Sequence, residues 1–268
     1  MFEAKLVQGH ILKKILDAMK DLVKCANWNC SSDGISVQSM DNSHVALVSL
    51  KLDADMFDPF RCDRNMVLGI NIENMNKILK CAGNDDTITL RAADNGDTVT
   101  FIFESPNGER TAQYEMRLMD VDDEQLGIPD TTYDAVVKMP SHEFQRICRD
   151  MSQISDSIAV SCTEDGVSFA STGDLGSGRV TLKQNTSVDK ENEQVTVELH
   201  EPISLTFAGR YLNTFCKATS VSPTVVMSLK SDTPLVLEYG ISDTMGTMKY
   251  YLAPKIEDDN DMQTQEEE

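Results

Sequence analysis

The chain repeats one pattern of apolar and polar residues at about half of its length. Residues 11–37 align with residues 143–169 at a constant separation of 132 positions. In both copies, a helical apolar periodicity is followed by a strand, an Asp-Gly turn and a second, alternating strand. The aligned pairs include Leu12 with Phe144, Ile15 with Ile147, Met19 with Met151 and Cys30 with Cys162. This repeat indicates a duplicated unit and therefore two similar halves.

A second alignment, between residues 75–90 and 212–227, has a separation of 137 positions and supports the duplication. Its aligned pairs include Asn76 with Asn213, Lys80 with Lys217 and Leu90 with Met227. Further strands are predicted at residues 98–103, 193–199, 203–207, 224–229 and 235–239. Several of them alternate apolar and polar residues, as half-buried antiparallel strands do. We therefore expect an α+β fold with two similar domains of antiparallel sheets.

An acidic segment with some apolar residues separates the two halves. We expect an N-terminal domain at 1–117, a connecting segment at 118–134, a C-terminal domain at 135–256 and an acidic disordered tail at 257–268. Within the connecting segment, Gly127 and Pro129 argue against a helix. Leu126, Ile128 and Pro129 predict an apolar docking patch, because solvation alone does not explain them. The alternative is that this segment folds onto its own domain.

Positive charge is concentrated in the predicted helices of a very acidic chain. The 268 residues include 24 Lys and Arg and 44 Asp and Glu, for a net charge of −20. Helical periodicity is found in residues 10–24, 73–80, 141–150 and 209–217. These four segments hold ten of the 24 cations but only five of the acids. If they share one surface, that surface can bind phosphate on an otherwise repelling molecule.

The alternative interpretation is that these cations only make the polar helix faces soluble. Lys13, Lys20 and Lys24 are spaced to form one stripe on the first helix, opposite its apolar face. Ser141 is a candidate N-cap of the third helix. The predicted outward faces hold no aromatic stacking platform, so contacts to nucleic acid would not read bases.

The residues that would carry catalysis or bind a metal do not form a recognisable motif. The seven cysteines are scattered without a C-x-x-C pair, which is typical of reduced thiols in a cytosolic or nuclear protein. The four histidines form no metalloprotease motif, and no Walker A sequence is present. We therefore expect no enzyme activity, no cofactor and no metal. The sequence contains neither a secretory signal nor an apolar run long enough to span a membrane.

The sequence resembles the proliferating cell nuclear antigen family, the eukaryotic sliding DNA clamps, over residues 1–256. The motifs that carry the resemblance include FEAKLVQG at 2–9, RCDRN at 61–65, KILKCAGN at 77–84, EQLGIP at 124–129 and KYYLAPKI at 249–256. The resemblance implies two similarly folded domains whose helices lie on one face and line the hole of a homotrimeric ring. One departure is Glu164, which replaces a modifiable lysine found in many members and puts ubiquitin-based signalling there in doubt.

The resemblance also implies three sets of site residues. The DNA-facing residues would be Lys13, Lys14, Lys20, Lys77, Lys80, Arg146, Arg149, Arg210 and Lys217, with Arg110 and Lys249 as weaker candidates. A groove for a short partner peptide with a Gln anchor and an aromatic plug, the PIP box, would be formed by Met40, His44, Val45, Leu47, Leu126, Ile128, Pro129, Tyr133, Pro234, Tyr251, Ala253 and Pro254. The trimer interface would include Cys81, Glu109, Arg110, Tyr114, Met151, Ile154, Leu175 and Gly178.

The implied function is that of a nuclear processivity factor for DNA replication and repair. It would encircle duplex DNA and tether DNA polymerase delta, flap endonuclease and DNA ligase, after loading by a separate clamp loader. The main alternative is a clamp-like adaptor subunit that assembles partners without forming its own homotrimeric ring. A hydrolase that uses unrecognised carboxylate chemistry is a second alternative.

Overall fold

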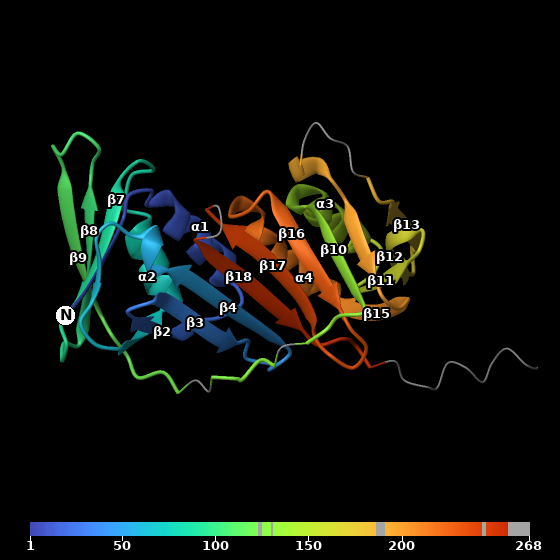
Figure 1. The fold of residues 1–268 in the computed structure, drawn as a ribbon, viewed down its shortest axis with the longest axis horizontal. Coiled ribbons are helices and arrows are strands. Elements are labelled where there is room, and N and C mark those ends of the chain that lie inside the picture. Colours follow the sequence, from blue (N-terminus) through green and yellow to red (C-terminus); the bar gives the residue numbers. More distant parts are fainter. Residues whose placement is uncertain (123–124, 130, 186–190, 243–244, 257–268) are drawn as a thin grey trace, which may run out of the picture.

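The computed structural model describes residues 1–122, 125–129, 131–185, 191–242 and 245–256. Its N-terminal and C-terminal halves lie side by side and repeat the same order of elements (Figure 1). The first half comprises β1 (Phe2–Leu6), α1 (His10–Met19), β2 (Cys25–Ser31), β3 (Gly34–Met40), β4 (Ala46–Asp53), the 3-10 turn η1 (Ala54–Met56), β5 (Phe60–Cys62), β6 (Met66–Asn71), α2 (Ile72–Leu79), β7 (Thr87–Ala92), β8 (Thr98–Glu104) and β9 (Thr111–Arg117).

The second half follows the same plan after the connecting segment. It comprises β10 (Ala135–Pro140), α3 (Ser141–Met151), β11 (Ser157–Thr163), β12 (Gly166–Gly173), β13 (Gly176–Leu182), the 3-10 turn η2 (Glu191–Glu193), β14 (Thr196–Leu199), β15 (Ile203–Ala208), α4 (Gly209–Phe215), the 3-10 turn η3 (Cys216–Ser220), β16 (Thr224–Leu229), β17 (Leu235–Ile241) and β18 (Gly246–Leu252).

The described strands form three antiparallel sheets. Their orders are β5-β1-β7-β8-β9, β13-β12-β11-β15 and, in the nine-stranded sheet, β14-β10-β16-β17-β18-β4-β3-β2-β6. The duplication is visible in these orders, because β5-β1-β7-β8-β9 repeats as β14-β10-β16-β17-β18, and β4-β3-β2-β6 repeats as β13-β12-β11-β15. The fold is therefore the two-domain α+β architecture that the sequence predicts.

The two halves are joined by the pairing of β18 with β4 at the centre of the nine-stranded sheet. Seven residue pairs, from Gly246 with Leu52 to Leu252 with Ala46, form this antiparallel ladder. The equivalent strands β9 and β13 have no second partner strand among the described residues and lie at opposite ends of the molecule (Figure 1). The pairing of β18 with β4 thus forms one such junction within the chain. The equivalent strands β9 and β13 remain edge strands in the described part of the chain.

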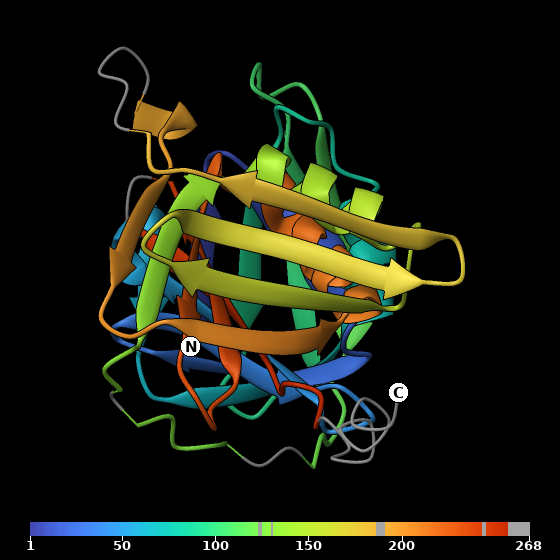
Figure 2. The ribbon, with the colours of Figure 1, turned by 90° about the vertical axis from the view of Figure 1, so that its right-hand side faces the viewer.

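The core forms because strand alternation and helix periodicity direct apolar side chains to the same interior. In β8, Val99, Phe101 and Phe103 are fully buried and alternate with partly exposed residues. In α1, Leu12 and Ile15 are among the residues packed into the core. Figure 2 shows the helices on one side of the nine-stranded sheet and the connecting segment, in green, on the other.

Several local predictions differ from the structure because tertiary contacts end the elements earlier. The first helix ends at Met19, and the Lys24 carbonyl accepts a hydrogen bond from the Ile72 N–H at 2.9 Å, so Lys24 lies outside the predicted helical stripe. Ser141 is not the N-cap, because Pro140 holds that position and the Ser141 hydroxyl donates to the Ser222 carbonyl at 2.6 Å.

Two further predictions differ in the C-terminal half. The predicted strand at 193–199 is limited to β14, because the chain before it forms η2 and an isolated bridge between Asn185 and Val195. The fourth helix ends at Phe215, so Lys217 lies in the following turn η3. The predicted disorder of residues 257–268 concerns residues outside those that the structure describes.

Candidate functional site

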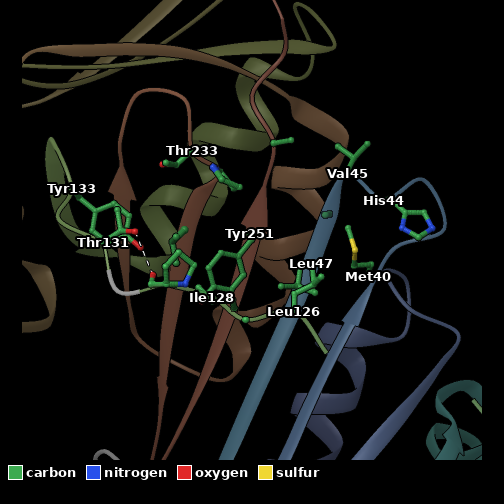
Figure 3. Close-up of a pocket in the computed structure, with 16 residues that line it drawn as sticks. Met40, His44, Val45, Leu47, Leu126, Ile128, Thr131, Tyr133, Thr233 and Tyr251 are labelled. Atoms are coloured by element: carbon green, nitrogen blue, oxygen red, sulfur yellow. Dashed lines mark hydrogen bonds between the residues drawn. The ribbon is translucent and has the colours of Figure 1, made fainter. Parts of the chain in front are cut away.

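An apolar groove of about 290 Å³ lies where the connecting segment passes over the nine-stranded sheet. Figure 3 shows Met40, His44 and Val45 along one side and Tyr133 and Thr131 along the other. The groove is lined by Met40, His44, Val45, Ala46, Leu47, Leu126, Gly127, Ile128, Pro129, Thr131, Tyr133, Thr233, Pro234, Val236, Tyr251 and Ala253. These residues come from both halves and from the connecting segment, so only the assembled chain forms the groove.

Two neighbouring strands and the chain beyond them supply the floor of the groove. Leu47 on β4 pairs directly with Tyr251 on β18. Beyond β18, the Ala253 N–H donates to the Val45 carbonyl at 3.1 Å. Burial raises the pKa of the Tyr251 hydroxyl, so this side chain remains neutral in the groove. The floor is therefore an uncharged surface suited to apolar side chains.

The connecting segment forms the outer wall and keeps its apolar residues accessible. Leu126 is 43% exposed to solvent, and Ile128 is 40% exposed. Upstream, the Met119 N–H donates to the Gly69 carbonyl at 3.0 Å, and the Asn27 side chain donates to the Val121 carbonyl at 2.9 Å. The segment is thus anchored on the N-terminal domain by polar contacts, while Leu126 and Ile128 face the groove.

The predicted groove residues all line this cavity except Pro254. The structure adds Ala46, Gly127, Thr131, Thr233 and Val236 to them. Ala46, Gly127 and Thr233 are direct chain neighbours of predicted residues, and Thr131 lies two positions from both Pro129 and Tyr133. Val236 lines the groove beside Tyr251, with which it pairs across β17 and β18. Strand alternation could have predicted Val236 from the sequence, because residues 234 and 236 of a strand lie on the same face.

The predicted DNA-facing cations lie on or directly after the four helices. Five of them contact a nearby acid: Lys20 with Asp17, Lys77 with Glu73, Arg146 and Arg149 with Asp150, and Lys217 with Asp21. By contrast, Lys14, Lys80 and Arg210 form no ion pair with another described residue. These three exposed side chains are the most available for a phosphate, since ion pairs already offset five of the other candidates and Lys13 is bonded to backbone carbonyls.

Lys13 has a structural contact that the sequence did not reveal. Its ammonium donates to the Ala82 carbonyl and to the Gly83 carbonyl, the latter at 3.1 Å, and so joins α1 to the chain after α2. The two weaker candidates for DNA contact also form ion pairs. Arg110 pairs with Asp86 at 3.5 Å, and Lys249 pairs with Glu238 at 2.8 Å. Lys249 lies on the strand β18 rather than on or directly after a helix.

The predicted interface residues form two separate clusters at the open sheet edges. Cys81 and Tyr114 are neighbours, since a hydrogen bond between their side chains raises the pKa of Tyr114. At the other end, a Cβ on Gly178 would lie 2.4 Å from the Ile154 Cδ1 and 3.5 Å from the Met151 Cε. Leu175, beside this second cluster, is 86% exposed. The two clusters lie on β9 and β13 or close to them, and the chain does not bring them together.

The sequence matches two family models, one after the other. Residues 1–125 match the N-terminal domain of proliferating cell nuclear antigen, and residues 127–255 match its C-terminal domain. The chain belongs to the proliferating cell nuclear antigen family. As a member of this family it is a DNA sliding clamp, and the clamps of the family are scaffolds rather than enzymes.

The described part of this proliferating cell nuclear antigen family member holds no metal-binding cluster, disulfide or membrane-spanning helix. Within the described residues, no group of three or more His, Cys, Asp or Glu side chains could hold a metal ion. All seven cysteines are free thiols, and burial raises the pKa of Cys30 to about 12 and of Cys162 to about 11. In the described part of the chain, no helix is long and apolar enough to cross a bilayer.

Proposed function

We propose that this protein forms a homotrimeric ring that encircles duplex DNA and tethers replication and repair enzymes through short peptide motifs. The observation that carries the proposal is that β9 and β13 are both edge strands in the described part of the chain. The pairing of β18 with β4 joins two domains inside the chain, and β9 and β13 are their free equivalents at opposite ends. Pairing β9 of one copy with β13 of the next would repeat the same junction, in a head-to-tail contact that can close into a ring.

The strand registers also predict which residues would meet at that junction. The ladder across β7, β8 and β9 repeats across β16, β17 and β18, as Leu90–Phe101–Tyr114 and Met227–Leu237–Tyr250. Tyr114 is therefore the equivalent of Tyr250. On the other strand, Ser39 pairs with Val48, and Ser171, which follows Ser39 by 132 positions, pairs with Gly178. Gly178 is therefore the equivalent of Val48.

Tyr250 pairs with Val48 inside the chain. By equivalence, Tyr114 would lie opposite Gly178 of a neighbouring copy. A glycine leaves space for the large ring of Tyr114, which is only half-buried in the single chain. Pairing would also remove two exposed sheet edges that otherwise invite non-specific association.

The helices would line the ring and contact DNA through phosphate. The helices lie on the opposite side of the nine-stranded sheet from the connecting segment (Figure 2). Lys14, Lys80 and Arg210, which lie on or directly after these helices, would make the main contacts. Phosphate contacts carry no sequence information, so a closed ring could slide along the duplex while remaining on it. The rest of this acidic chain would repel DNA and restrict contact to the helices.

The apolar groove would receive the PIP-box motif of a partner. An aromatic plug would fit its uncharged floor of Leu47 and Tyr251, and a Gln anchor would bind beside this floor. Partners of this kind include DNA polymerase delta, flap endonuclease and DNA ligase, with a clamp loader opening the ring. These activities would place the protein in the nucleus. The N-terminal domain would span residues 1–117 and the C-terminal domain residues 135–256, joined by the segment at 118–134.

Light scattering tests the ring directly. The wild-type protein should have a mass of about 89 kDa, three times the 29.8 kDa of one chain. The Tyr114→Ala variant should have a mass near that of one chain, whereas Tyr133→Ala, which alters only the groove, should keep the wild-type mass. A wild-type mass near that of one chain would contradict the ring and favour the clamp-like adaptor that assembles partners without a ring of its own. Retention on circular but not linear DNA then tests encirclement.

A further inference from the structure

One carboxylate beside the groove receives hydrogen bonds from four donors. Asp41, which is only 7% exposed, lies between β3 and β4. Its Oδ1 accepts from the Val45 and Ala46 N–H groups, each at 2.8 Å, and its Oδ2 accepts from the Ser43 N–H at 3.1 Å. The fourth donor is the Tyr211 hydroxyl, at 2.7 Å from Oδ2. Ser43 and Val45 belong to the loop that follows Asp41, and Ala46 begins β4, so this carboxylate determines the shape of the loop.

The Tyr211 hydroxyl is the one donor of the four that comes from the other half of the chain. Tyr211 lies on α4, 170 positions from Asp41, and is 8% exposed. Its ring packs against Phe215 at 6.4 Å between centroids, and Phe215 stacks on Tyr250 at 4.4 Å. Because packing holds the ring in place, the hydroxyl is a fixed donor rather than a mobile surface group.

The loop held by Asp41 forms one wall of the groove. His44 and Val45 line the groove and immediately precede β4. The backbone of His44 has a φ of 55°, a conformation that costs free energy in residues other than glycine. Its N–H donates to the Asp41 carbonyl at 3.0 Å. Such a strained turn persists only where surrounding contacts determine it, which makes the bonds at Asp41 essential to the wall.

We propose that Tyr211 is a positioning residue for the peptide groove, and that its hydrogen bond to Asp41 holds the 41–45 loop in the conformation that binds a partner. This inference rests on the proposed function of the groove. Arg210, the adjacent residue, places its guanidinium 4.9 Å from the centroid of the Tyr211 ring and belongs to the proposed DNA-facing set. Helix α4 therefore connects the proposed DNA surface with the wall of the groove.

The experiment compares Tyr211→Phe with a matched variant that loses a similar bond elsewhere. The Tyr250 hydroxyl is buried and also joins the two halves, because it donates to the Ala18 carbonyl at 3.0 Å. Tyr250→Phe thus removes the same atom and a comparable hydrogen bond, but leaves Asp41 intact. Tyr239→Phe is a second control, since the Tyr239 hydroxyl has no hydrogen-bond partner among the described residues.

Fluorescence polarisation should be measured with a short labelled peptide that contains a Gln anchor and an aromatic plug. We expect Tyr211→Phe to weaken binding about fivefold, the order expected for losing one hydrogen bond to a charged group. Tyr250→Phe and Tyr239→Phe should bind as wild type does. In Asp41→Asn, adding Tyr211→Phe should cause no further loss, because Tyr211 acts through the carboxylate.

Amide hydrogen exchange without peptide provides a readout of the loop itself. Exchange at Ser43, Val45 and Ala46 should be faster in Tyr211→Phe than in wild type, but unchanged in Tyr250→Phe. If wild type fails to bind the peptide, the proposed function of the groove is contradicted, and the exchange rates still decide the role of Tyr211. If wild type binds, and Tyr211→Phe matches it in affinity and exchange, the inference is overturned.

Discussion

Gln38 and Leu126 form two hydrogen bonds with each other across 88 positions of sequence. The Gln38 Nε2 donates to the Leu126 carbonyl at 3.0 Å, and its Oε1 accepts from the Leu126 N–H at 2.6 Å. The side-chain amide thus pairs with the connecting segment as a neighbouring strand would. The two bonds fix the backbone of the connecting segment against β3 at Leu126, which lines the groove.

Replacing Gln38 with Ala should therefore loosen the outer wall of the groove. We expect peptide affinity to fall by about threefold to tenfold, since two hydrogen bonds are lost at a partly exposed site. Fluorescence polarisation with the labelled peptide measures this change. Gln8→Ala is the control, because Gln8 is exposed in the turn before α1 and lies outside the groove lining. Equal affinities of the two variants would contradict a role for Gln38 in holding the segment.

Gly69 should be required for anchoring the start of the connecting segment. A Cβ at this position would lie 1.8 Å from the Met119 carbonyl oxygen, a backbone atom that can move only with the segment. We expect Gly69→Ala to lower the free energy of unfolding by about 1–3 kcal/mol and to increase proteolytic cleavage of the segment. Thermal denaturation and limited proteolysis measure these effects. Gly240→Ala, where the added Cβ meets no atom within 4 Å, should leave cleavage of the segment unchanged.

The three unpaired helix cations should contribute more to DNA affinity than three paired ones. Replacing Lys14, Lys80 and Arg210 with Gln removes charges that no described acid offsets, so the slope of log affinity against log salt should decrease by up to about 3.

The matched control replaces Lys20, Lys77 and Arg149 with Gln. This variant loses the same formal charge, but Asp17, Glu73 and Asp150 already offset part of it. The slope should therefore change less. Salt titrations of duplex DNA binding compare the two variants, and equal slopes would show that the internal ion pairs do not matter for binding.

The stability contributed by Asp41 should depend on pH. Burial raises the pKa of its carboxyl, but the hydrogen bonds from Ala46, Tyr211, Val45 and Ser43 outweigh burial and hold the pKa below its ordinary value. A group with a lowered pKa in the folded state stabilises the protein above its ordinary pKa of about 4, and this contribution is lost as the pH falls through the lowered value.

We therefore expect wild type to have a higher melting temperature than Asp41→Asn at neutral pH. The difference should narrow as the pH decreases below about 4, because protonation of Asp41 removes the same interactions in wild type. Melting curves of both proteins across this range measure the effect. A difference that stays constant down to acid pH would show that the charge of Asp41 is not what stabilises the loop.

The sequence alone determined the features that depend on local patterns. The repeat at 132 and 137 positions predicted two similar halves, and the alternation of apolar residues predicted most strands. The concentration of cations in the helices was equally visible, because charge and helical periodicity can be counted along the chain. The groove residues were predicted through resemblance, with only Leu126, Ile128 and Pro129 indicated by their own chemistry.

Only the tertiary structure decided how those side chains are used, because their partners are distant in sequence. Lys13 carries the same charge as Lys14, yet its ammonium binds carbonyls about 70 positions away. Lys24 fits the helical stripe, but its carbonyl is bonded to the start of α2. The bond between Asp41 and Tyr211 spans 170 positions. Local periodicity sets which face of an element is buried, whereas the packing of the two halves sets which polar group meets which partner.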